Sequence, residues 1–294
     1  MSGRARPADR QWPRERGGSA LVSANEYEVF RDWLEKSSGI LLGDNKQYLV
    51  KSRLRKILAE HGISSLTELV DRIRKQPRSG LREAVVDAMT TNETLWFRDI
   101  HPFRILEERL LPELAEERTT QPIRIWSAAC STGQEPYSIA MVIAELKKTK
   151  PHLVRRPVRI VATDLSGRVL DIAKRGEYEM LAIGRGLSRE RLRMHFDEVE
   201  SGVWKVKPEI QRMVEFRPLN LKDSYALLGK FDIIFCRNVL IYFSADLKKD
   251  ILTRMHGALK KGGYLMLGAS ESLSGMQDKF DMVHCSPGIV YRAK

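Results

Sequence analysis

Residues 123–137, which read IRIWSAACSTGQEPY, carry the strongest fold signal in this chain. An apolar run ends in small residues, Gly133 follows, and an apolar-periodic segment then extends from Tyr137 to Leu146. This order predicts a strand, a tight turn and a helix. A nucleotide-type ligand can bind over such a turn, because the backbone can approach the ligand and the helix N-terminus offers free N–H groups. The pattern alone is equally compatible with a purely structural turn.

Composition narrows the class of protein. The 294 residues suffice for two domains of ordinary size, and 43% of them are hydrophobic, enough to bury a core. No apolar run approaches the ~20 residues that span a bilayer, and no long apolar region follows the arginine-rich N-terminus, so neither membrane insertion nor a signal peptide is expected. The three cysteines lack C-x-x-C spacing, so we expect no disulfide framework, no metal site and a cytoplasmic location. The net charge of +12 favours an anionic partner.

The N-terminal third divides by composition and periodicity. Residues 1–20 are rich in Arg, Pro and Gly and predict a disordered basic tail. Residues 21–90 show four apolar stripes at helical spacing, which indicate a small all-helical domain. Residues 91–122 follow as an interdomain linker with a helix of its own between Pro102 and Leu114.

From residue 123 to 294 the pattern predicts an α/β domain. Short β-branched runs at 123–128, 158–163, 214–217, 231–236 and 263–267 alternate with helices, as in a parallel sheet. Two further runs, 280–284 and 289–292, predict a terminal antiparallel hairpin, and the whole layout is that of Rossmann-like methyltransferases. Residues 177–213 exceed what one crossover needs, and runs at 196–199 and 203–206 predict an inserted β-subdomain there.

Polar residues follow several of the predicted strands. Ligands of open α/β sheets bind outside the carboxyl ends of the strands, where Asp164, Asn220 and Asn238 stand. Asp164 could accept hydrogen bonds from both hydroxyls of a ribose, or it could cap the helix that begins near Ser166. An asparagine in such a place is often only a turn residue. Together with Glu135 after the first strand, the set favours a ligand site.

Seven motifs in a fixed order closely resemble the chemotaxis receptor methyltransferases of the CheR family. The resemblance covers nearly the whole chain beyond the tail, and its departures are small, such as Gln134 where the family often has Glu. The motifs are TTNETLWFRD at 90–99, SAACSTGQEPY at 127–137, ATDLS at 162–166, NL at 220–221, FCRNVLIYF at 235–243, GYLMLG at 263–268 and SE at 270–271.

The resemblance implies a Rossmann-like methyltransferase that uses S-adenosyl-L-methionine (SAM) and releases S-adenosyl-L-homocysteine (SAH). Its substrates would be specific glutamates of chemoreceptors, the methyl-accepting chemotaxis proteins, converted to methyl esters for sensory adaptation. Arg98 and Tyr242 would face the transferred methyl group. The cofactor-binding residues would be Asn92, Thr94, Arg98, Glu135, Asp164, Asn220, Leu221, Arg237 and Asn238.

The residues present suit that chemistry. A glutamate side chain has an ordinary pKa of about 4.3, so it is ionised at neutral pH and needs no general base. Accordingly, none of the motifs contains a histidine. Arg98 could orient the incoming carboxylate through two parallel hydrogen bonds, or bind the carboxylate of the cofactor. Tyr242 could hydrogen-bond near the sulfur or the attacking oxygen, or only pack beneath its loop.

Two features bear on the partner. The predicted helix around residues 45–58 carries no acidic residue between its ends, so it could dock on the Glu- and Gln-rich methylation helices of receptors, or be an ordinary solvated face. Its basic residues are Lys46, Lys51, Arg53, Arg55 and Lys56. In the CheR family the inserted β-subdomain can bind a C-terminal receptor pentapeptide as an added strand. Here the connection at 200–202 is very short, so we expect that the pentapeptide is not required.

Two other functions are compatible with parts of the sequence. The positive charge suggests a nucleic-acid methyltransferase, but no Asn-Pro-Pro-Tyr follows the run at 231–236 and no catalytic Pro-Cys pair is present, so no nucleic-acid partner is expected. A binding scaffold without catalysis is disfavoured because the set of Arg98, Glu135, Asp164, Asn238 and Tyr242 is intact. We expect a monomer that is recruited to membrane-embedded receptor arrays.

Overall fold

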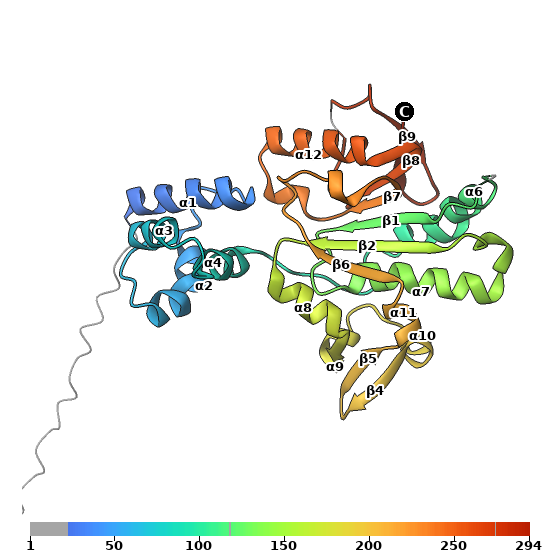
Figure 1. The fold of residues 1–294 in the computed structure, drawn as a ribbon, viewed down its shortest axis with the longest axis horizontal. Helices are drawn as coiled ribbons and strands as arrows, with labels where there is room; N and C mark the ends of the chain where they lie inside the picture. The colour runs from blue at the N-terminus through green and yellow to red at the C-terminus, as the bar shows by residue number, and fades with distance from the viewer. Residues whose placement is uncertain (1–22, 118, 274) are drawn as a thin grey trace, which may run out of the picture.

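The computed structural model describes residues 23–117, 119–273 and 275–294. The predicted basic tail at 1–20 therefore lies outside the described residues. An all-helical part stands beside a large sheet with helices on both faces, and a small second sheet projects below it (Figure 1).

Within the described residues, the all-helical part has four helices that bury the predicted apolar stripes. The first begins with a capping box between Ser23 and Glu26 and ends at Gly39, whose φ of 83° closes the helix in the left-handed region. The centre of its core includes Phe30, Leu54 and Leu69, all fully buried. The helices are α1 (Ala24–Ser38), α2 (Gln47–Glu60), α3 (Leu66–Lys75) and α4 (Leu81–Met89).

The helix predicted at 102–114 is also present. It runs through α5 (His101–Ile105), a π-helical turn η1 (Leu106–Leu110) and α6 (Leu111–Ala115). Its buried side chains pack in the same core cluster as those of the helix α7 (Gln134–Thr149) that follows the first strand.

The main sheet has seven strands in the order β6-β2-β1-β7-β8-β10-β9. The first five in this order are parallel, and β10 pairs antiparallel with both β8 and β9, so the predicted parallel sheet and terminal hairpin are confirmed. The strands are β1 (Ile123–Ala128), β2 (Val158–Asp164), β6 (Val214–Pro218), β7 (Phe231–Cys236), β8 (Leu259–Leu267), β9 (Phe280–His284) and β10 (Ile289–Ala293).

The strand boundary that differs most from the prediction is the start of β8; four other strands, β2, β4, β6 and β10, end one residue later than predicted. Strand β8 begins at Leu259, four residues before the expected start at 263, because Leu259 pairs with Phe231 ahead of a register shift. The sequence does not predict this extension, because charged residues and glycine are depleted in strands, and the extension contains Lys260, Lys261 and Gly262.

Helices cover both faces of the sheet. Successive strand residues point to opposite faces. Ile125 therefore joins the core cluster under α7, while Trp126 joins the cluster that includes Met255 of α12 (Ala245–Ala258). These helices place their N-termini at the carboxyl edge of the sheet (Figure 1). Outside the insertion, the other helices are α8 (Gly167–Arg175) and the short η2 (Pro151–Leu153), η3 (Ala226–Leu228) and η4 (Leu240–Tyr242).

The insertion between β2 and β6 forms its own small sheet with the order β3-β5-β4. The predicted hairpin is confirmed as β4 (Phe196–Glu200) and β5 (Val203–Val206). A third strand, β3 (Glu177–Glu179), escaped prediction because it is only three residues long. The helices of the insertion are α9 (Met180–Ile183), α10 (Arg189–His195) and α11 (Pro208–Gln211).

Candidate functional site

A cavity of about 270 Å³ lies between the all-helical part and the carboxyl ends of the strands. All ten site residues predicted from the sequence line it. The linker contributes Asn92, Thr94 and Arg98, and η4 contributes Tyr242. The strand ends and the segments that follow them contribute Glu135, Asp164, Asn220, Leu221, Arg237 and Asn238.

The turn after β1 adopts a glycine-like backbone without glycines at two of its positions. Ala129 and Ser131 have φ of 56° and 51°, in the left-handed region that non-glycine residues rarely adopt. Bonds on both sides hold Ser131: its N–H donates to Asp164 Oδ2 at 2.8 Å, and its hydroxyl donates to the carbonyl of Asn92 at 2.8 Å. The turn therefore fixes the linker as well as the ligand-facing backbone.

Asp164 lies at the end of β2, and its carboxylate oxygens can accept further hydrogen bonds. Its two carboxylate oxygens each accept one backbone N–H bond, from Ser131 and from Ser166 at 2.9 Å. Burial raises the pKa of Asp164, and the hydrogen bonds from Ser166 and Ser131 oppose that rise. The helix cap is a different group, since the Ser166 side chain accepts from the N–H of Val169. The carboxylate can thus still accept hydrogen bonds from a ligand.

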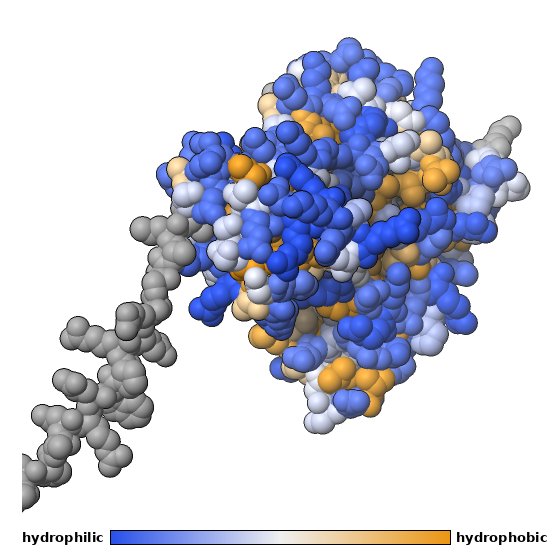
Figure 2. Space-filling view, turned by 60° about the vertical axis from the view of Figure 1, so that its left-hand side comes forward, coloured by the Kyte–Doolittle hydropathy of each residue, from blue (hydrophilic) through white to orange (hydrophobic). Residues whose placement is uncertain are grey.

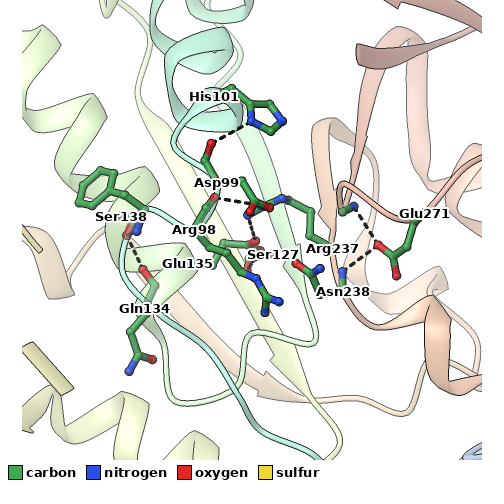
Figure 3. A network of polar contacts seen from close by, with 12 residues as sticks. Arg98, Asp99, His101, Ser127, Gln134, Glu135, Ser138, Arg237, Asn238 and Glu271 are labelled. Carbon is green, nitrogen blue, oxygen red and sulfur yellow. Dashed lines mark hydrogen bonds and ion pairs between the residues drawn. The ribbon is translucent and has the colours of Figure 1, made fainter. Parts of the chain in front are cut away.

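Arg237 is the centre of a buried ionic network (Figure 3). Its side chain is 1% exposed, and it donates to Asp99 Oδ2 at 2.6 Å, to Glu135 Oε2 at 3.2 Å and to the carbonyl of Arg98 at 2.9 Å. The other oxygen of Glu135 accepts from Ser127 at 2.7 Å. Burial raises the pKa of Glu135, and the Arg237 charge opposes the rise. Arg237 therefore fixes the linker and Glu135 at the cavity wall.

The linker passes the cavity with an unusual backbone. Phe97, Asp99 and Ile100 have φ of 49°, 66° and 57°, all left-handed. Between them, Arg98 is half-buried, and its guanidinium makes only a 3.4 Å bond to the carbonyl of Glu93 among the described residues. In Figure 3 the Arg98 side chain extends away from the Arg237 network. Its guanidinium is available to a ligand.

Glu271 holds the loop after β7. Its carboxylate accepts backbone N–H bonds from Asn238 at 2.7 Å, Val239 at 3.0 Å, Leu240 at 2.8 Å and Gly268 at 2.8 Å. Asn238 has a left-handed φ of 58°, and its buried Oδ1 finds no hydrogen-bond partner within the described part of the chain. A buried acceptor without a partner is costly, which points to a donor on the ligand.

The all-helical part is bonded to the sheet at the cavity rim. Asn220 Nδ2 donates to the carbonyl of Ser37 at 2.9 Å, and Lys222 Nζ donates to the carbonyl of Lys36 at 2.6 Å. The N–H of Leu41 donates to the carbonyl of Tyr242 at 2.9 Å. The loop at 40–43 thereby becomes an apolar wall of the cavity.

Sequence reasoning missed the loop at 40–43 and gave no role to Glu271. Glu271 belongs to the SE motif at 270–271, and that motif was the sequence feature that could have indicated a role for it.

One of the predicted docking residues has another task. Arg53 donates to the carbonyls of Met89 at 2.8 Å and Thr90 at 3.2 Å and to the hydroxyl of Thr91 at 3.1 Å. Arg53 therefore supports the start of the linker. Arg53 and Lys46 both line the cavity. Lys51, Arg55 and Lys56 of the predicted set are exposed.

The cavity suits a nucleoside ligand that carries both donors and a charged end. Asp164 and the orphan oxygen of Asn238 supply acceptors, Arg98 supplies a cation, and the loop at 40–43 supplies an apolar wall. Among the described residues no cluster of His, Cys, Asp or Glu could hold a metal ion. Among the same residues, no helix has both the length and the apolar character needed to cross a membrane.

Comparison with known proteins agrees with this geometry. The model of the CheR methyltransferase SAM-binding domain matches residues 92–289, and that of the CheR methyltransferase all-alpha domain matches residues 25–90. Chemotaxis protein methyltransferase 1 of Pseudomonas aeruginosa is 63% identical over 93% of this chain and 100% of its own.

Two further relatives match over a similar length. Chemotaxis protein methyltransferase Cher2 of Pseudomonas putida is 61% identical over 92% of this chain and 98% of its own. Chemotaxis protein methyltransferase 1 of Vibrio cholerae is 54% identical over 93% and 98%. This chain is therefore a SAM-dependent methyltransferase, and it belongs to the CheR methyltransferase family.

Proposed function

We propose that the protein methylates the side-chain carboxylates of specific glutamates in chemoreceptors. The observation that carries this proposal is the lining of the cavity: a cationic Arg98 faces it, and no histidine is among its lining residues in the described part of the chain. A site that must accept an already ionised carboxylate needs a positive partner and no general base. The names of the relatives, which are chemotaxis methyltransferases, agree with a receptor substrate.

Each cavity residue then has a proposed task. Asp164 would bind the ribose hydroxyls, while Asn220 and Leu221, with Arg237 and Asn238, would line the adenine and methionine ends of the cofactor. Asn92, Thr94 and Glu135 would complete its binding site. When bound, SAM supplies a methyl group on a positively charged sulfur, which a carboxylate oxygen can accept directly.

The remaining task of the protein is alignment and exclusion of water. Arg98 would orient the incoming carboxylate through paired hydrogen bonds, and Tyr242 would face the methyl group from the opposite loop. Two charged reactants become two neutral products, so a site that excludes water favours the transition state over the solvated ions. The apolar wall at 40–43 serves that exclusion.

The function is tested by transfer of tritiated methyl groups from SAM into receptor-containing membranes of the same cell. We expect labelled receptor whose label is released by mild base, as a carboxyl methyl ester requires. Base-stable label would show another acceptor atom, and label in nucleic acid would show another substrate. Absence of transfer to every receptor of the cell would favour a binding scaffold.

Asp164→Ala should weaken SAH binding by about 1.5–3 kcal/mol, the range for a hydrogen bond to a charged group. Calorimetry on the folded variant measures this loss. Asp171→Ala is the matched control, because Asp171 is an exposed carboxylate on the neighbouring helix α8. Unchanged affinity in Asp164→Ala would remove Asp164 from the cofactor site.

Docking to the receptor is proposed to run over the basic face of α2 and its N-terminal end. The face of the molecule that carries the all-helical part is largely hydrophilic (Figure 2). Lys46, Lys51, Arg53, Arg55 and Lys56 could approach acidic receptor helices, and exposed charges are screened beyond about 8 Å at physiological salt. Raising the salt concentration should therefore raise KM for receptors with little change in kcat.

Charge reversal tests the same surface. Arg55→Glu combined with Lys56→Glu should raise KM without changing SAH affinity, whereas Arg53 is left intact because it holds the linker. Lys147→Glu with Lys148→Glu is the control, since these exposed lysines lie at the C-terminal end of α7. Equal KM values for the two double variants would contradict docking through α2.

The inserted subdomain is not expected to require a receptor pentapeptide. Strand β4 is an edge strand, but only Ser201 and Gly202 connect it to β5, so the hairpin offers little loop to enclose a peptide. Titration with synthetic C-terminal receptor pentapeptides should show no binding. Micromolar binding to any of them would show that the edge accepts an added strand. We propose that the protein acts as a monomer in the cytoplasm, at receptor arrays.

A further inference from the structure

The inserted subdomain contacts the linker that carries Arg98. The N–H of Trp96 donates to the carbonyl of Arg185 at 3.0 Å, and its indole N–H donates to the carbonyl of Ala182 at 3.1 Å. The Trp96 ring is fully buried, edge-on against Tyr178 at 5.0 Å and Phe196 at 5.3 Å between centroids. The linker therefore rests on the insertion just before Arg98.

Arg191 of α10 makes the next contact along the linker. Its guanidinium carbon lies 3.9 Å from the centroid of the Phe97 ring, well within the range of a cation–π interaction. Two of its nitrogens donate to the two carboxylate oxygens of Glu145 on α7, each at 2.9 Å. Such a bidentate pair fixes the plane and position of the guanidinium.

Glu145 is itself held in place. The buried His195 lies with its Nε2 at 3.0 Å from Glu145 Oε1. Although burial opposes ionisation, the hydrogen bonds from His195 and Arg191 lower the pKa of Glu145 to about 2. The carboxylate is thus ionised at any working pH, and it anchors Arg191 from the rigid helix that follows the cofactor turn.

The linker needs such anchors because its backbone is strained. A left-handed φ at a non-glycine residue is strained and persists only where the surroundings enforce it. Phe97 is one such residue, and its N–H donates to Ser138 at 3.1 Å. On the other side of Arg98, the buried Arg237 binds the carbonyl of Arg98 and the Asp99 side chain. Arg98 thus lies between two guanidinium anchors.

We propose that Arg191 is a positioning residue for methyl transfer, which holds the Phe97 ring so that Arg98 faces the cavity. The inserted subdomain is then part of the scaffold of the active site in addition to any contact with a partner. The inference rests on the proposed role of Arg98. Arg191 is not among the residues that line the cavity, and it acts on Arg98 through the ring of the preceding residue, Phe97.

Arg191→Gln tests the proposal, with Arg193→Gln as the matched control because Arg193 is an exposed arginine on the same helix. We expect kcat to fall by about tenfold, because the Phe97 ring loses its cation–π partner and Arg98 loses its fixed position. KM for the receptor should stay close to that of the control, whereas the thermal midpoint should fall, because Glu145 loses its bidentate partner. Normal kcat in folded Arg191→Gln, whatever its thermal midpoint, would show a merely structural role and overturn the proposal.

Phe97→Leu reaches the same contact from the other side, keeping an apolar side chain while removing the ring face. If the two residues act through one contact, the double variant loses no more kcat than the more impaired single variant. If the losses of kcat in the two single variants multiply in the double variant, the proposal is wrong. If Arg191→Gln does not fold, normal kcat in Phe97→Leu would overturn the proposal instead. Arg191→Lys, which keeps the charge without the fork, should be intermediate. An active Arg98→Ala variant would instead remove the role of Arg98 on which the inference rests.

Discussion

Arg98→Ala and Arg98→Lys should both lose most of the methyl-transfer activity while keeping the fold. The folded protein has little to lose, because the guanidinium makes one long bond of 3.4 Å to the carbonyl of Glu93 among the described residues. The reaction has much to lose, since paired hydrogen bonds to a carboxylate require a planar fork that a lysine ammonium lacks. Steady-state kinetics with receptor membranes measure the loss, and circular dichroism checks the fold.

Arg104→Ala is the matched control for Arg98, because Arg104 is an exposed arginine on the adjoining α5 whose nearest acid, Glu108, lies 3.5 Å away. The two proposed tasks of Arg98 separate in binding experiments. If Arg98 orients the substrate, SAH affinity is kept and kcat falls. If it binds the cofactor carboxylate, SAH affinity falls as well. Near-normal turnover in Arg98→Lys would exclude bidentate orientation in either form.

The fold was predictable where burial imposes a period. Strands β1 and β7 are predominantly apolar because both of their faces are covered, and the stripes of α3 and α4 repeat at helical spacing. The missed strand segments are those in which local composition opposes the pairing. The start of β8 carries Lys260 and Lys261, and β3 is too short to show alternation.

The site was predictable from topology, because residues that follow parallel strands meet at one edge of the sheet. That rule brings Asp164, Asn220 and Asn238 to a single cavity. The roles assigned to these residues stay predictions. The contribution of the loop at 40–43 was not predictable, since it depends on how Asn220 and Lys222 bind the carbonyls at the end of α1. Contacts between a side chain and a distant backbone carbonyl leave no periodic signal in a sequence.

The inserted subdomain shows the same limit. Its hairpin was visible in the sequence, and surplus segments of this kind suggest partner contacts. Trp96 donates to the backbone carbonyls of Ala182 and Arg185 in this subdomain. Any residue type offers such a carbonyl, so the sequence does not predict these bonds. Gly186 is a residue type that this contact does require, because a Cβ there would lie 2.2 Å from the carbonyl oxygen of Trp96.

Glu271→Gln should weaken SAH binding by tenfold or more and lower the thermal midpoint. The carboxylate accepts four backbone N–H bonds, three of them from residues 238–240 of the loop after β7. A glutamine offers one acceptor oxygen and an NH₂ group that would face the remaining donors. Each lost hydrogen bond to a charged group is worth about 1.5–3 kcal/mol, so the left-handed turn at Asn238 would relax and move its side chain from the cavity.

Two further variants make this result specific to the loop. Glu209→Gln changes an exposed glutamate on α11 and should leave SAH binding and the thermal midpoint unchanged. Gly268→Ala leaves the carboxylate in place but puts a Cβ 2.7 Å from Glu271 Oε2 and 2.9 Å from the backbone nitrogen of Asn238. It should therefore reproduce the loss of affinity seen in Glu271→Gln. A folded Glu271→Gln protein with unchanged SAH affinity would mean that the loop keeps its shape without the carboxylate, and that Asn238 is held by other contacts.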